Sequence, residues 1–138
     1  MKNLEKILVI DDDEDAPYFI SRFLEKDGYE TKISRNGQIA LHMLGNEIFG
    51  IILLDIKMPV LNGVSALDKI KQLKPEPVVI VFTGERDCDK EREMIQKGVF
   101  GVIYKPYKLN DVRNLLKKAN LEYKNRKRYE NEKENLGS

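Results

Sequence analysis

The chain has 138 residues, about the length of one domain, and its 24 basic and 23 acidic residues leave a net charge of +1. This balance excludes a protein that binds nucleic acid through bulk positive charge, and a composition that is 41% apolar excludes a wholly disordered chain. The apolar runs are far shorter than the roughly 18 residues that cross a bilayer, so we expect no membrane span. The single cysteine, Cys88, excludes an internal disulfide framework and predicts a cytoplasmic protein.

Short apolar runs alternate with longer amphipathic stretches along the chain. Four runs rich in β-branched residues predict strands buried on both faces, and a fifth, alternating run predicts an edge strand. In chain order the expected strands cover 7–10, 29–34 (the edge strand), 50–54, 78–82 and 101–104. Apolar residues three and four apart predict helices over 19–24, 39–44, 64–73, 87–97 and 109–119. Three glycines are each expected to end a helix in a left-handed conformation, namely Gly28, Gly45 and Gly98.

This succession of five strand–helix units predicts an α/β fold of the doubly wound type. Such units predict right-handed crossovers and a five-stranded parallel sheet with helices on both faces. The helix over 87–97 carries few apolar residues among many charged ones, so we expect it to pack weakly against the sheet.

The residues after the fifth helix differ from the rest in composition. They are rich in charge, and pairs such as Glu122 with Arg126 support a helix. A heptad pattern does not continue past Tyr123. We therefore expect one domain over 1–120 and a charged helical tail over 121–138. The alternative for the tail is a linker or pairing surface that leads to a partner domain.

Polar side chains follow four of the five expected strands. Because ligands of doubly wound sheets bind beyond the carboxyl ends of the strands, these side chains are candidates for one site. They are carboxylates after the first and third strands, a hydroxyl after the fourth and an ammonium group after the fifth. In chain order these residues are Asp11, Asp12, Asp13, Asp55, Thr83 and Lys105.

The clustered carboxylates predict a bound cation or a retained proton. Two ionised carboxylates about 4 Å apart repel by about 4 kcal/mol at an effective dielectric near 20. All-oxygen ligands select a hard ion, and Mg²⁺ is the common choice beside phosphate. A carboxylate next to a metal ion and a lysine can attack phosphorus and form an acyl phosphate. Taken singly, the same residues are equally well explained as helix caps, loop residues and strand ends; taken together they favour a site.

The motifs at these positions resemble the receiver domain of two-component response regulators. They are ILVIDDD at 7–13, LDIKMP at 54–59, NG at 62–63, VFTG at 81–84 and KPY at 105–107. The resemblance covers residues 4 to about 120. It implies a flavodoxin-like sheet with strand order 2-1-3-4-5 and a function in His–Asp phosphorelay signalling.

The resemblance also implies a role for each motif residue. Asp55 corresponds to the phosphoacceptor, which receives a phosphoryl group from a histidine of a sensor kinase or phosphotransfer protein. Thr83 matches the switch hydroxyl and Lys105 the phosphoryl-binding lysine, with a cis bond expected before Pro106. The implied Mg²⁺ ligands are Asp12 directly, Asp11 partly through water, Asp55 and the backbone carbonyl of Lys57.

The chain departs from the family pattern near two of these motifs. Three residues before Lys105, receivers commonly carry an aromatic residue whose rotamer follows phosphorylation, and here Val102 occupies that position. Tyr104 is expected to point to the opposite face of the strand and not to replace this ring. Lys57 and Glu85, each two positions past a site residue, are expected to influence how fast water reaches the phosphoryl group.

The leading hypothesis is therefore a phosphoacceptor that catalyses its own phosphotransfer and dephosphorylation and is not an enzyme acting on a separate substrate. We expect a partner upstream, the kinase or phosphotransfer protein, and one downstream, an effector protein or a missing output domain. We expect no direct binding to nucleic acid, and we leave a homodimer open. The alternatives are a receiver-like docking module without phosphorylation and an aspartate-dependent phosphatase. The phosphatase usually needs a second acid where this chain has Lys57.

Overall fold

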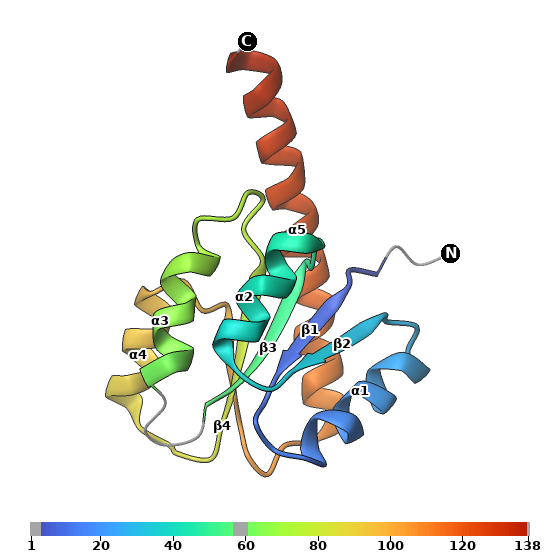
Figure 1. Ribbon diagram of the computed structural model, residues 1–138, viewed down its shortest axis with the longest axis vertical. Coiled ribbons are helices and arrows are strands. Elements are labelled where there is room, and N and C mark those ends of the chain that lie inside the picture. Colours follow the sequence, from blue (N-terminus) through green and yellow to red (C-terminus); the bar gives the residue numbers. More distant parts are fainter. Residues whose placement is uncertain (1–3, 57–60, 138) are drawn as a thin grey trace.

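Five parallel strands alternate with five helices in a computed structural model that describes residues 4–56 and 61–137 (Figure 1). The strands are β1 (Ile7–Ile10), β2 (Thr31–Ser34), β3 (Ile51–Ile56), β4 (Val78–Thr83) and β5 (Gly101–Tyr104). The helices are α1 (Ala16–Lys26), α2 (Gly37–Asn46), α3 (Leu61–Ile70), α4 (Cys88–Gln96) and α5 (Leu109–Gly137). The sheet order is β2-β1-β3-β4-β5, which confirms the predicted α/β fold and strand order.

The register of the sheet aligns the carboxyl ends of its central strands. Ile10 pairs with Leu54, and Ile56 pairs with Thr83, which in turn pairs with Tyr104. The carboxyl ends of β1, β3, β4 and β5 therefore gather at one end of the molecule, the lower end in Figure 1. This is the edge at which the sequence predicts a site.

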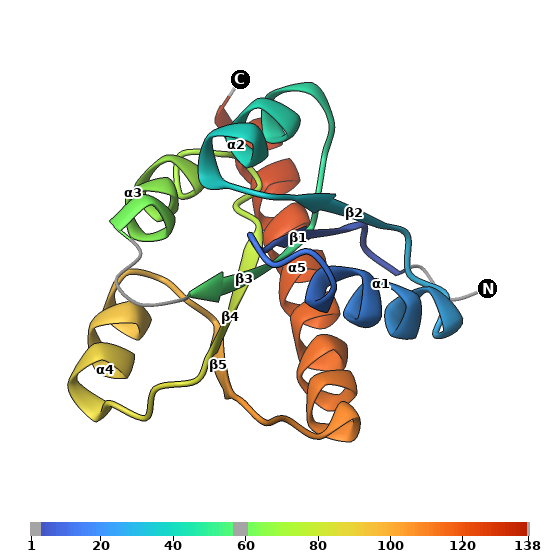
Figure 2. The ribbon, with the colours of Figure 1, turned by 60° about the horizontal axis from the view of Figure 1, so that its bottom comes forward.

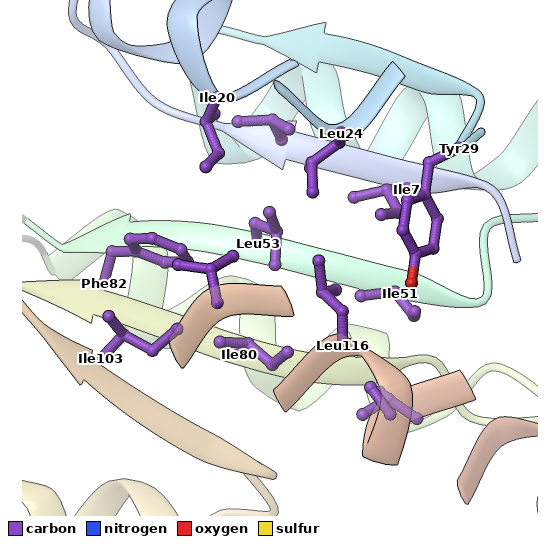
Figure 3. Packing of buried hydrophobic residues seen from close by; sticks show 14 of the residues in the cluster. Ile7, Ile20, Leu24, Tyr29, Ile51, Leu53, Ile80, Phe82, Ile103 and Leu116 are labelled. Atoms are coloured by element: carbon purple, nitrogen blue, oxygen red, sulfur yellow. The ribbon is translucent and has the colours of Figure 1, made fainter. Parts of the chain in front are cut away.

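Both faces of the sheet are covered by helices, so its central strands are continuous apolar runs. Helices α1 and α5 lie on one face, and α2, α3 and α4 lie on the other (Figure 2). Figure 3 shows the first layer, in which Ile20 and Leu24 of α1 and Leu116 of α5 meet the strand residues Leu53 and Ile80. All residues of β1 and β4 are buried. The strands that lead to the carboxyl edge of the sheet are therefore held in place by packing on both faces.

Helix α5 stays attached to the domain beyond the expected boundary at residue 120. The buried Asn120 donates from Nδ2 to the Tyr29 hydroxyl at 2.8 Å, and its Oδ1 accepts from the Glu5 amide at 2.9 Å. Arg126 donates to the backbone carbonyls of Glu76 and Pro77, at 3.1 and 2.9 Å. Residues 131–136 are all exposed, and the last turns of the helix project from the body, at the top of Figure 1.

Two of the three expected glycine caps are confirmed. Gly28 and Gly98 follow α1 and α4 with φ of 100° and 97°, a conformation that glycine adopts without strain. Gly45 lies inside α2, where the helix continues to Asn46, so that expectation was wrong. Within the described part of the chain, no helix is both long enough and apolar enough to cross a membrane.

Candidate functional site

A partly buried ion pair joins the ends of β3 and β5. The Lys105 ammonium donates to Oδ2 of Asp55 at 2.6 Å, and the Asp55 side chain is only 6% exposed. The second oxygen, Oδ1, is fully buried and has no hydrogen-bond partner among the described residues. A buried carboxylate oxygen without a partner is energetically costly, and a bound cation would offset that cost.

The three aspartates after β1 differ in burial and in the hydrogen bonds that they accept. Asp11 is buried, and its Oδ1 accepts from the Asp13 amide at 2.9 Å. Asp13 in turn accepts from the amides of Asp15 and Ala16, at 2.8 and 3.2 Å, and so organises the start of α1. Asp13 thus bonds the amide of the first residue of α1, although the N-cap position is Asp15, whose side chain makes no cap hydrogen bond. Asp12 is exposed to solvent.

Thr83 ends β4, where it pairs with Ile56, the residue after Asp55 on β3. The residue is 7% exposed, and its hydroxyl oxygen accepts from the Glu85 amide at 3.2 Å. The Glu85 carboxylate pairs with Lys90 of α4 at 3.1 Å. Lys57, expected to contribute its carbonyl and to act together with Glu85, lies outside the described residues.

A cavity of about 410 Å³ opens at this edge of the sheet. Asp11, Asp55 and Lys105 line it together with apolar side chains, among them Phe82 and Tyr107. The Phe82 and Tyr107 rings meet edge to face at 5.1 Å. Burial, with the charges of Asp55 and Asp11 nearby, raises the pKa of the Tyr107 hydroxyl, which keeps it protonated and uncharged at neutral pH.

The donors at this edge fit a hard cation. Two buried carboxylates line one cavity, Asp11 and Asp55, and Oδ1 of Asp55 has no hydrogen-bond partner among the residues that the structure describes. Oxygen ligands of this kind suit Mg²⁺. Across residues 4–56 and 61–137, no group of three or more His, Cys, Asp or Glu side chains is arranged to hold a metal by itself.

The face of the strand expected for Tyr104 was wrong. Val102 packs against the apolar layer under α2, α3 and α4, and Tyr104, two residues further along β5, lies on the same face. The Tyr104 hydroxyl donates to the Glu91 carboxylate of α4, and the Arg86 guanidinium lies 4.6 Å from the centre of the tyrosine ring. The alternation of side chains along a strand was the signal in the sequence that could have placed Tyr104 on the same face as Val102.

The comparisons with known proteins agree with this architecture. The family model described as "Response regulator receiver domain" matches residues 7–117. Sporulation initiation phosphotransferase F of Bacillus subtilis is 30% identical over 114 residues, which cover 83% of this chain and 92% of that protein. Regulatory protein AtoC of Escherichia coli is 27% identical over 119 residues, which cover 86% of this chain.

The chain spans only 26% of the length of AtoC. Among solved structures, NtrX from Brucella abortus superposes with a TM-score of 0.83 at 25% identity, over 98% of this chain and 30% of NtrX. The family model covers most of the chain, and the fold and strand order agree with it. The chain therefore belongs to the response regulator receiver family, whose members act in two-component signalling.

Proposed function

We propose that this chain is a phosphoacceptor that takes a phosphoryl group on Asp55 from a phosphohistidine and thereby changes its interaction with a downstream partner. The observation that carries the proposal is the buried Asp55 carboxylate, with one oxygen held by Lys105 and the other without a partner among the described residues. The ion pair with Lys105 holds the carboxylate in one orientation through Oδ2. The lone pairs of Oδ1 are not used in a hydrogen bond to any described residue.

The transfer step follows from this geometry. An oxygen of Asp55 attacks phosphorus, the P–N bond to the histidine breaks, and the departing imidazole nitrogen keeps the bonding electron pair and takes up a proton. The product is an acyl phosphate on Asp55. Lys105 then exchanges the carboxylate for a phosphoryl oxygen, and the Thr83 hydroxyl donates to another phosphoryl oxygen. Asp11, Asp12, Asp55 and the Lys57 carbonyl would hold Mg²⁺, which would neutralise charge on the transferring group.

The proposed partners follow from this role. A sensor histidine kinase or a phosphotransfer protein supplies the phosphoryl group, and an effector protein or a further domain of a longer polypeptide receives the signal. In this scheme residues 1–120 form the receiver and residues 121–138 a helical linker. The chain works in the cytoplasm and acts on its own carboxylate, without a separate substrate.

Intact mass measurement tests the phosphoacceptor directly. Incubation with Mg²⁺ and acetyl phosphate is expected to add one base-labile phosphoryl group, and Asp55→Asn is expected to abolish the addition. Asp68→Asn is the matched control, because Asp68 is an exposed residue of α3. An adduct that persists in Asp55→Asn, or no adduct from either acetyl phosphate or a histidine phosphodonor, would contradict the proposal.

A receiver-like docking module without phosphorylation is the second candidate, and Val102 favours it because valine has no ring to reorient. Thermal unfolding with Mg²⁺ separates the two. A site that binds Mg²⁺ gains about 2.7 kcal/mol at a hundredfold excess over the dissociation constant. No shift at saturating Mg²⁺, together with no adduct, would favour the docking module.

A further inference from the structure

Tyr104 lies between the candidate site and helix α4. Its backbone pairs with Thr83 on β4, and the next residue along the chain is Lys105. The side chain is half-buried and points toward α4, the face on which Val102 also packs. Tyr104 is therefore one strand away from the switch hydroxyl and one residue away from the phosphoryl-binding ammonium group.

Helix α4 is weakly attached to the sheet, and Tyr104 supplies one of its attachments. None of its residues is buried, and Ile95 is 47% exposed. Met94 makes a partly buried apolar contact with the layer beneath. The Tyr104 hydroxyl donates to Glu91 in the first turn of the helix, and a hydrogen bond to a charged acceptor is stronger than one between neutral groups. A helix held by so few contacts can change position at small cost.

The loop between β4 and α4 connects Thr83 to the same ring. Glu85 donates its amide to the Thr83 hydroxyl at 3.2 Å, and Arg86, the next residue, stacks on Tyr104 at 4.6 Å. When the Thr83 hydroxyl turns toward another partner, the Glu85 amide loses its acceptor. The loop, and with it Arg86, is then free to leave the tyrosine ring.

We propose that Tyr104 is the positioning residue through which phosphorylation of Asp55 controls α4 in this chain. This inference rests on the proposed function. In the unphosphorylated protein the ring is stacked under Arg86 and bonded to Glu91, which holds loop and helix in place. Recruitment of the Thr83 hydroxyl by the phosphoryl group shifts the loop, unstacks Arg86 and releases Glu91. Val102 has neither a ring that could stack on Arg86 nor a hydroxyl that could donate to Glu91, so it cannot position α4 in this way.

Hydrogen–deuterium exchange over α4 tests the inference. In the wild type, amides of residues 88–97 are expected to be protected before phosphorylation and to exchange faster after treatment with Mg²⁺ and acetyl phosphate. Tyr104→Phe keeps the ring but loses the hydrogen bond. It is expected to raise exchange in the unphosphorylated protein by about threefold to tenfold, and phosphorylation should then add little. Tyr129→Phe is the matched control, because Tyr129 lies in the exposed last part of α5.

Variants of the acceptor separate a specific bond from a general loosening. Glu91→Gln keeps a carbonyl oxygen for the tyrosine hydroxyl and is expected to keep most of the protection, whereas Glu91→Ala is expected to match Tyr104→Phe. The double variant Tyr104→Phe/Glu91→Ala is expected to exchange no faster than either single variant, because both remove the same bond.

Two outcomes would overturn the inference, and mass spectrometry on the same samples identifies the cause. If the adduct forms on Asp55 and Tyr104→Phe still shows the full wild-type change in α4 exchange, Tyr104 does not position the helix. If no variant forms an adduct, the proposed phosphoacceptor function fails, and the inference about its control fails with it.

Discussion

The contribution of Asn120 to the attachment of α5 can be measured as a change in the free energy of unfolding. Its amide group donates to the Tyr29 hydroxyl at 2.8 Å and to the Leu116 carbonyl at 2.9 Å, and it accepts from the Glu5 amide at 2.9 Å. The residue is 6% exposed. Asn120→Ala removes all three bonds and leaves two groups without these partners, the Tyr29 hydroxyl and the Glu5 N–H. At about 1–3 kcal/mol for each buried group left unsatisfied, partly offset by water, we expect a loss of about 2–4 kcal/mol.

Urea denaturation followed by circular dichroism measures this loss. Tyr29→Phe removes only one partner and is expected to cost about 1 kcal/mol. Because both residues share one hydrogen bond, the double variant should cost less than the two single losses added together, by about 1 kcal/mol. Asn125→Ala, at an exposed asparagine of the same helix, is the control and should change stability by no more than about 0.5 kcal/mol. A loss below about 0.5 kcal/mol for Asn120→Ala would refute the reasoning.

Three further predictions concern the site. Lys105→Met removes the ammonium group that bonds Asp55 and is expected to slow adduct formation from acetyl phosphate about a hundredfold. The rate is measured by intact mass as a function of time. A rate within twofold of wild type would be inconsistent with a phosphoryl-binding lysine. The hydrogen bond to Glu91, with some burial, raises the pKa of Tyr104 to about 12. The folded state therefore holds this proton more tightly than the unfolded state, so the stability that the group contributes is complete below pH about 10 and is lost as the pH rises toward 12. Ultraviolet titration should show one high-pKa tyrosine fewer in Tyr104→Phe, and an unchanged titration would show that this hydroxyl is not bonded in solution. Glu85→Ala is expected to change the rate of dephosphorylation of the adduct, and equal half-lives of variant and wild type would end that hypothesis.

The sheet and the position of its site could be predicted because both depend on local sequence. Strands buried on both faces need continuous apolar runs, and β1, β3 and β4 appear in the sequence as such runs. The polar residues directly after them lie at one edge because parallel strands end together. Asp55 and Lys105 were expected at this edge, and the structure pairs them.

The parts that could not be predicted depend on contacts between distant residues. Gly45 follows an apolar stripe as a cap would, but α2 continues past it, because the residue after the stripe does not fix where a helix stops. The attachment of Arg126 to the carbonyls of Glu76 and Pro77 joins residues about 50 positions apart, which no local pattern indicates. The face of Tyr104 could have been predicted from the alternation of side chains along the strand, but no pattern in the sequence indicated its partner Glu91 on α4.

The length of α5 has a mechanical consequence. The helix begins at Leu109, four residues after Lys105, and continues without interruption for 29 residues, which at 1.5 Å per residue is about 43 Å. Leu116 and Tyr123 are buried against the sheet and Arg126 bonds the carbonyls of Glu76 and Pro77, so the helix moves together with the body of the domain. Its exposed last turns, at 131–136, extend that rigid body outward. A rotation of the whole domain by about 5° around the first turn of α5 would therefore move the far end of the helix by about 4 Å.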